Sequence, residues 1–163
     1  GTMGAPCTLH LKKRARQHWE ANNKSDHLVL GFTADEEKRA SRFALTERSN
    51  LIPILVDENI TKQDCFDMLL AEGIALPKIY SLGYPNANCI GCVKATSPTY
   101  WNLVRKTHPD IFQRRAEQSE EIGAKLVRHK GKRILLKDLP ADAKGRDLKK
   151  FDFECGIFCE EEI

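Results

Sequence analysis

Apolar residues recur at helical spacing near the start of the chain, and short continuous apolar runs follow them. Four apolar residues lie at this spacing among lysines and arginines: Leu9, Leu11, Ala15 and Trp19. The pattern predicts a basic amphipathic helix over residues 8–22. The apolar run 27–32 predicts a buried strand, the segment 35–48 a second helix, and the run 50–55 a second strand.

Punctuating residues refine this pattern. Pro53 cannot donate to a strand ladder, so it fits a sheet edge or the end of a strand. Thr61 and Asp64 resemble a capping box that opens a helix to about Glu72, with Gly73 suited to follow it. The order helix, strand, helix, strand, helix predicts an α/β layer with parallel strands.

The second half of the chain contains more residues that interrupt helices and strands. The segment 77–88 contains Pro, Gly and Asn and predicts a loop. Ser97 followed by Pro98 predicts a helix start, and Pro109 predicts a restart that continues to about Leu126. A turn at 129–132 is predicted to join two short extended pieces.

The composition describes an ordinary globular chain. Its 163 residues, 41% hydrophobic and 30% charged, suit a single domain with a real core. A net charge of +3 is too small to indicate nucleic acid as a partner by itself. No apolar stretch has the length of a membrane span and no signal-peptide pattern is present, so we expect a cytoplasmic protein without membrane contact. Residues 1–3 resemble a vector remnant.

Cysteine spacing carries the strongest chemical signal. Cys89-Ile-Gly-Cys92 is a C-x-x-C, in which Gly91 permits a tight backbone that turns amides toward sulfur. Alone it fits a metal site, a redox disulfide or coincidence. A second close pair, Cys155 and Cys159, favours four thiolates around one metal centre, because such a site closes a long loop.

The identity of the metal stays open at this point. Four thiolates suit zinc or an iron–sulfur cluster; the apolar residues around both pairs favour a buried cluster, but spacing does not select the metal, and four buried structural cysteines are the alternative. Cys65 lies within a predicted helix and is interpreted as a core residue. Cys7 precedes a helix, whose N-terminus would lower a thiol pKa, so it is a fifth candidate ligand, a reactive thiol or a buried residue.

Two basic groups are candidate anion sites. Lys38, Arg39 and Arg42 follow the turn after the first predicted strand, where phosphate or sulfate could bind; a solvated helix face is the alternative. The basic run 129–133 could contact nucleic acid phosphates, but an exposed hairpin tip explains it as well. Because Glu160–Glu162 oppose such binding, nucleic acid is not an expected partner.

Five stretches, spread over nearly the whole chain in the expected order, resemble the phosphoadenosine phosphosulfate (PAPS) reductase family, particularly its small phage and bacterial members. They are Pro6-Cys7-Thr8 with Leu11-Lys12-Lys13, residues 31–39, residues 89–94, Tyr100-Trp101-Asn102 with Arg105, and residues 154–159. Tyr100 and Trp101 are interpreted as packing around the cysteine loop rather than as base-stacking groups.

The resemblance implies a fold and a chemistry. The fold is a partial Rossmann-like, adenine nucleotide alpha-hydrolase-like parallel sheet flanked by helices, with a Cys-rich C-terminal cluster-binding region. The implied substrate is an adenylated sulfonucleotide. Cys155 matches the family's nucleophile, which attacks the sulfur of activated sulfate, and a thioredoxin-like reductant then releases the product. By the same match, Cys7, Cys89 and Cys92 are ligands of a [4Fe–4S] cluster, completed by one C-terminal cysteine, Cys155 or Cys159.

The resemblance also organises the chain. Residues 4–88 correspond to the α/β nucleotide-hydrolase-like part, and residues 89–163 to a helical, cysteine-ligated part of the same domain. The family's Ser-Gly-Gly nucleotide-binding loop is absent, so a fragment that is inactive alone is expected. A missing first strand would leave a sheet edge open, which predicts a homodimer.

The sequence therefore predicts a PAPS reductase-like protein with a [4Fe–4S] cluster, and zinc as the second choice of metal. Two other functions stay open: a non-catalytic zinc or iron–sulfur interaction module, and a sulfurtransferase relative that acts on nucleic acid.

Overall fold

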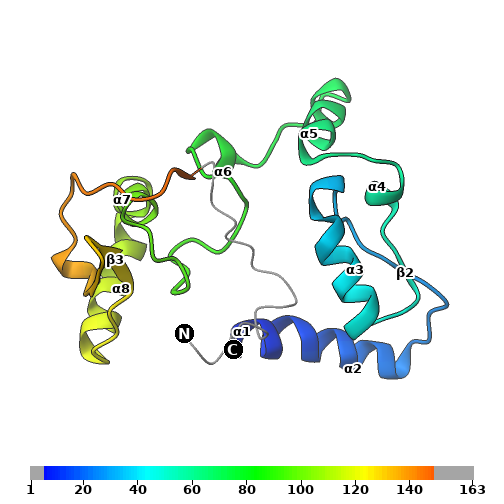
Figure 1. Cartoon of the computed structure of the whole chain (residues 1–163), viewed down its shortest axis with the longest axis horizontal. Helices are drawn as coiled ribbons and strands as arrows, with labels where there is room; N and C mark the ends of the chain where they lie inside the picture. Colours follow the sequence, from blue (N-terminus) through cyan, green and yellow to red (C-terminus); the bar gives the residue numbers. More distant parts are fainter. Residues whose placement is uncertain (1–5, 149–163) are drawn as a thin grey trace. The chain divides into compact units, whose positions relative to one another are not determined.

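The computed structural model describes residues 6–148, which divide into two compact units (Figure 1). Residues 6–13 and 77–148 belong to unit 1, and Arg14–Leu76 form unit 2. Helical backbone continues through α1 (Pro6–Thr8), the π-helical turn η1 (Leu9–Lys13) and α2 (Arg14–Asn22). The predicted N-terminal helix is thus confirmed, and the division between the units falls within it.

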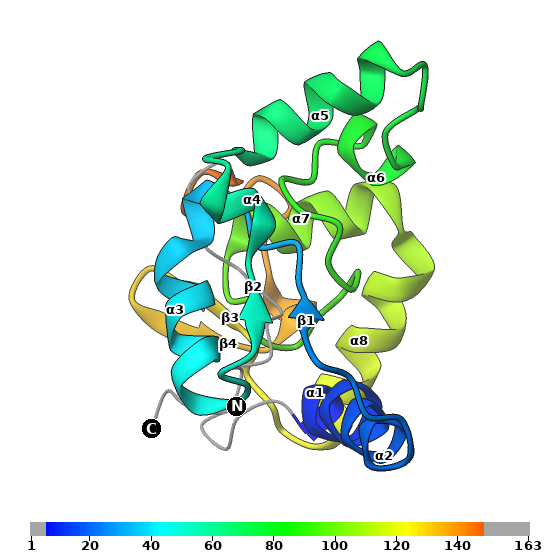
Figure 2. The same ribbon diagram turned by 90° about the vertical axis from the view of Figure 1, so that its right-hand side faces the viewer.

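Unit 2 contains a β–α–β element. Strand β1 (Leu28–Val29) pairs in parallel with β2 (Leu51–Ile52), and α3 (Glu37–Thr46) connects them after the short 3₁₀ helix η2 (Ala34–Glu36). Figure 2 shows β1 and β2 side by side, with the light-blue-to-cyan helix α3 next to β2. Parallel strands need a crossover of this kind, because a tight turn cannot join them. The predicted mixed α/β class and the parallel pairing are confirmed.

The second strand is shorter than its apolar run predicted. It ends at Ile52, and Pro53 precedes the helical turn α4 (Ile54–Asp57). Proline lacks the N–H that would extend the ladder, so the chain leaves the sheet at this residue. The strand prediction for residues 54 and 55 was therefore wrong, although the placement of Pro53 at a strand end was correct.

The capping box predicted for the next helix is present. In α5 (Lys62–Ala71) the Thr61 hydroxyl accepts the Asp64 N–H, and the Asp64 carboxylate accepts the Thr61 N–H at 2.8 Å. The Asp35 carboxylate accepts a third N–H, that of Lys62, at 3.1 Å. Gly73 follows the helix at φ +69°, as its predicted role requires.

The core of unit 2 is small. Among its residues Phe32, Ala40 and Phe43 are the buried hydrophobic ones, and the two phenyl rings lie 5.9 Å apart. An ion-pair network on α2 supports this core: Arg16 bridges Glu20 and Glu47 and lies over the Phe43 ring. No residue of α5 is buried, so most of the apolar burial in the described chain lies in unit 1.

Unit 1 contains three helices after residue 77, then a β-hairpin. The elements are α6 (Lys78–Ser81), α7 (Pro98–Thr107), α8 (Pro109–Glu121), β3 (Val127–His129), β4 (Lys132–Ile134) and the 3₁₀ helix η3 (Leu136–Asp138). The two Pro-initiated helices and the antiparallel hairpin confirm the sequence predictions. Two details differ: the predicted loop contains α6, and α8 stops at Glu121 because Gly123, at φ +68°, ends it.

The core of unit 1 forms between α7, α8 and the hairpin. Trp101, Val104, Val127 and Leu136 are completely buried there. Trp101 contacts Phe112 of α8 and its neighbour Tyr100 edge-to-face, with ring centroids 6.5 and 5.5 Å apart. This packing fixes α7, from which the side chains of the candidate site project.

Across residues 6–148, none of the helices combines the length and the apolar character needed to cross a bilayer.

Candidate metal centre

The C-x-x-C loop lies between α6 and α7 and is bound to the Tyr100 hydroxyl. That oxygen accepts the Gly91 N–H at 2.9 Å and the Cys92 N–H at 3.4 Å, and its own proton goes to the Cys89 carbonyl at 3.3 Å. Gly91 was predicted to make a tight turn that directs amides toward sulfur. The tight turn is confirmed, but the two amides point to a phenolic oxygen instead.

Gly91 is required by both its conformation and its surroundings. Its φ is +69°, which side-chain-bearing residues rarely adopt. A Cβ atom there would lie 2.7 Å from Ile111 Cγ2 of α8, closer than packed atoms allow. Arg115, also on α8, donates from Nε to the Gly91 carbonyl at 3.1 Å. The turn between the two cysteines is therefore held from both helices.

Further hydrogen bonds hold the chain that follows the loop. The Ala95 N–H donates to the Cys92 carbonyl at 3.0 Å, and the Trp101 indole N–H donates to the Ala95 carbonyl at 2.8 Å. The Arg128 N–H of β3 donates to the Thr96 carbonyl at 2.8 Å. The loop is thus fixed to α7, α8 and β3, with the two sulfur-bearing residues at its turn.

Burial raises the pKa of Tyr100 to about 12; the N–H donors from Cys92 and Gly91 act against this rise. The hydroxyl consequently keeps its proton at neutral pH and can donate to Cys89. Cys89 is exposed, Cys92 is half-buried, and neither forms a disulfide. They can therefore reach a metal ion from a backbone that is already ordered.

The structure describes only part of the predicted ligand set. Cys7 is an exposed free thiol that belongs to unit 1, as do Cys89 and Cys92. Within the described ranges no three His, Cys, Asp or Glu side chains gather closely enough to hold a metal ion. Cys155, the predicted nucleophile and ligand, and Cys159, the other predicted ligand, lie outside the described residues. The described part of the site is a two-thiol turn.

The predicted anion-binding residues lie in the other unit. Lys38, Arg39 and Arg42 are all on α3, and Lys38 and Arg42 are exposed one helical turn apart. Arg39 forms an ion pair with Glu36 and lies 5.2 Å from the Phe32 ring centroid. Cys65, interpreted as a core residue, is half-buried on α5, where no residue is fully buried.

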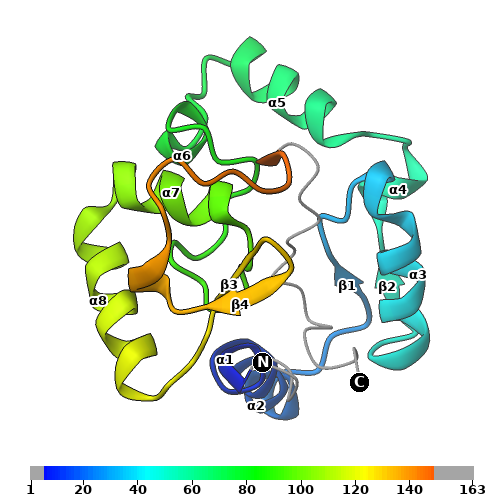
Figure 3. The same ribbon diagram turned by 60° about the vertical axis from the view of Figure 1, so that its left-hand side comes forward.

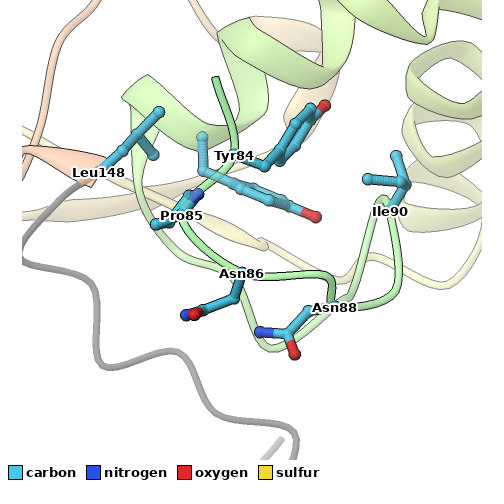
Figure 4. Close-up of a pocket in the computed structure, with 7 residues that line it drawn as sticks. Tyr84, Pro85, Asn86, Asn88, Ile90 and Leu148 are labelled. Carbon is cyan, nitrogen blue, oxygen red and sulfur yellow. The ribbon is translucent and has the colours of Figure 1, made fainter. Parts of the chain in front are cut away.

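A small pocket adjoins the cysteine loop (Figure 4). It is lined by Tyr84, Pro85, Asn86, Asn88, Ile90, Tyr100 and Leu148. The Tyr84 hydroxyl is 2.7 Å from Thr107 Oγ1, which fixes that ring at the pocket wall. Neither this pocket nor the role of Arg115 was predicted, because no local spacing links these residues; Tyr100 was correctly expected beside the loop.

Comparison with known proteins identifies no family. No protein-family model matches the chain, and neither the curated proteins nor the solved structures contain a match. The interpretation of the site therefore depends on its own residues and on the five stretches described above.

Proposed function

We propose that this chain is a PAPS reductase-like protein whose Cys89 and Cys92 are two ligands of a [4Fe–4S] cluster. One observation carries the proposal: both cysteines flank a turn that Tyr100 and Arg115 hold by hydrogen bonds, with a glycine that cannot be replaced without a clash. An ordered turn lowers the entropy lost when two thiolates bind the same centre. A bound cluster would supply electron transfer or a structural link between distant parts of the chain.

The remaining ligands in this proposal come from Cys7, Cys155 and Cys159. Cys7 shares unit 1 with the C-x-x-C loop, which is consistent with a role as a ligand. The C-terminal pair would bring a segment distant in sequence to the same centre. Zinc, which also accepts four thiolates, is the competing metal.

The proposed reaction is reduction or sulfur transfer on an adenylated sulfonucleotide. The Cys155 thiolate would attack the sulfur of the activated sulfate, release the adenine nucleotide and form a thiosulfonate. A thioredoxin-like dithiol would then release sulfite and become a disulfide. The parallel β1–α3–β2 element is compatible with the adenine nucleotide alpha-hydrolase-like sheet implied by the resemblance. Lys38, Arg39 and Arg42 near the start of α3 are the proposed contacts to anionic groups.

Metal analysis tests the proposed cluster. We expect anaerobically purified protein to be brown and to contain about four iron and four sulfide ions per chain. Cys89→Ser and Cys92→Ser should lose most of both, whereas Cys65→Ser, a cysteine on α5 of unit 2, should retain them. Colourless protein with one zinc ion per chain would show that the thiolates hold zinc rather than a cluster. A chain without bound metal would overturn the proposal.

Calorimetry tests the proposed substrate. With the chain joined at its N-terminus to the family's Ser-Gly-Gly nucleotide-binding segment, we expect adenosine phosphosulfate to release heat on binding, and the double variant Lys38→Gln/Arg42→Gln to bind it more weakly. An absence of heat at about 1 mM ligand would reject the sulfonucleotide while leaving the metal result unaffected.

A further inference from the structure

The low net charge of the chain conceals a separation of charge between the units. The described residues of unit 1 contain sixteen lysines and arginines against seven aspartates and glutamates, a net charge of +9. Unit 2 contains eight lysines and arginines against eleven aspartates and glutamates, a net charge of −3. A strongly basic unit inside a nearly neutral chain indicates an anionic partner for that unit.

The basic residues concentrate on the β3–β4 hairpin. Between Glu121 and Asp138 the chain has six basic residues and no acidic one: Lys125, Arg128, Lys130, Lys132, Arg133 and Lys137. Lys137 forms an ion pair with Glu120 at the edge of this stretch. The hairpin tip, residues 128–133, contains no apolar side chain, although protein interfaces generally need an apolar centre.

The hairpin register places two arginines opposite each other on one face. Figure 3 shows β3 and β4 side by side. In their register Arg128 pairs with Arg133, and the adjacent pair is Val127 with Ile134. Val127 is completely buried, so strand alternation puts both arginines on the solvent side, where they are exposed. Their Cβ atoms are about 5 Å apart in such a pair, and like charges directly opposite destabilise a sheet. A phosphate bound between the guanidinium groups would remove this repulsion.

A second basic group is fixed beside the hairpin. Gly145 donates its N–H to Thr99 Oγ1 at 2.9 Å, and a Cβ atom there would lie 2.7 Å from Pro98 Cδ. The segment 144–146 is therefore tight against the start of α7, and it carries the exposed Lys144 and Arg146. The backbone N–H of Arg128 donates to the Thr96 carbonyl, which lies just before the start of α7.

The two basic groups thus flank one turn of chain, residues 96–99, from which α7 begins. Asp142 and Asp147 are the acidic residues closest in sequence to the second group and only partly offset it. The first turn of α7 adds the positive end of a helix dipole, so the whole surface favours a chain of negative charges.

We propose that the β3–β4 hairpin and residues 144–146 bind the phosphodiester backbone of a nucleic acid. Arginine guanidinium groups suit phosphate oxygens because they donate two parallel hydrogen bonds. The surface is distinct from the C-x-x-C turn but is connected to it through residues 92–96. The sequence alone did not favour nucleic acid, because the acidic residues of unit 2 and of the last residues cancel most of the charge of unit 1.

Filter binding with the full chain tests this proposal. The probes are radiolabelled single strands of DNA and RNA of about 20 nucleotides, long enough to cover a site of ordinary size. We expect binding that weakens steeply with salt. Arg128→Gln/Arg133→Gln should weaken binding about tenfold at low salt and reduce the slope of log K against log salt by about 1.4, the value for two lost phosphate contacts. Comparison of the affinities for the DNA probe and the RNA probe shows which of the two nucleic acids is the preferred ligand.

The matched control is Lys78→Gln/Lys106→Gln, which removes the same charge from exposed positions on α6 and at the last turn of α7. It should change affinity much less than the arginine pair. The arginine substitutions relieve a repulsion but also remove the hydrogen bond that Arg133 Nη1 donates to the Leu126 carbonyl at 3.0 Å, so that variant should unfold close to the wild-type temperature. Absence of binding at low salt, equal losses in both double variants, or equally tight binding of poly-glutamate would each overturn the proposal.

Discussion

Tyr100 occupies a position that joins the core of unit 1 to the cysteine loop. Its ring packs against Trp101 and Tyr84, while its hydroxyl contacts the backbone of Cys89, Gly91 and Cys92. The sequence predicted that this side chain would lie beside the loop. It did not reveal that one oxygen would satisfy three backbone groups, because that depends on the rotation of α7 relative to residues 89–92.

Tyr100→Phe tests the contribution of the hydroxyl. The change leaves two N–H groups and a carbonyl without their partner, so we expect a loss of about 1–3 kcal/mol in the free energy of unfolding. The Cys89 and Cys92 thiols should also react faster with a thiol reagent. Urea unfolding and reaction kinetics measure the two effects. Tyr84→Phe removes a hydroxyl bonded to Thr107 instead, and its thiol kinetics should match those of the wild type.

The pH dependence of stability follows from the same residue. Burial raises the pKa of Tyr100 to about 12, above that of an unfolded tyrosine near 10. The stabilisation is therefore fully present below about pH 10 and is lost as the pH rises from about 10 to 12, because the unfolded chain releases the proton first. Ultraviolet titration of tyrosinate should show a late-ionising group that Tyr100→Phe abolishes. Ionisation of all tyrosines near pH 10 would contradict this expectation.

The elements were predicted best where a side chain directly dictates the backbone. Pro98 and Pro109 at helix starts, the Thr61 capping box and the turn at Lys130-Gly131 all behaved as expected. Apolar runs were less informative, because burial in a strand and burial in a helix favour the same residues. This ambiguity explains the error after Ile52, whereas α6 was missed because the Pro, Gly and Asn residues of the segment 77–88 predicted a loop.

The cap of α5 offers a test at this scale. The helix has no buried residue, so little tertiary packing compensates for a lost cap. Thr61→Ala should cost about 1 kcal/mol of local stability and accelerate amide hydrogen exchange in residues 62–65. The Thr61 contacts also lower the pKa of Asp64, so the protection factors of the α5 amides, which correct for the slower intrinsic exchange at low pH, should decrease as the pH falls toward the range in which this carboxylate takes up a proton. In Gln63→Ala, which leaves the cap intact, exchange at these amides should remain close to that of the wild type.

The molecule as a whole was harder to predict than its parts. The mixed α/β class followed from the order of elements, but the division at Leu76 and Pro77 did not, since no charge run or low-complexity linker marks it. The unequal charges of the two units are increased by residues 6–13, whose two lysines group with the second half of the chain. The division into units depends on contacts between residues that are distant in sequence, whereas patterns in a single sequence indicate local structure.

The division between the units predicts where the folded chain is first cleaved by a protease. Residues 72–75 are exposed and lie between α5 and the unit boundary. Brief digestion with elastase, followed by mass spectrometry, should give a first cut near Ala75. First cuts within α7 or α8 would show that unit 1, despite its larger core, opens before this segment.

The two tryptophans of the chain provide a spectroscopic means of following each unit. Trp101 is completely buried beneath the cysteine loop, whereas Trp19 on α2 of unit 2 is 59% exposed. Their emission maxima should differ: the maximum of the buried indole should lie at a shorter wavelength than that of the hydrated one. In Trp19→Phe the remaining fluorophore donates its N–H to Ala95, three residues after Cys92. Quenching of that single emitter would then report the arrival of an iron–sulfur cluster at the thiols.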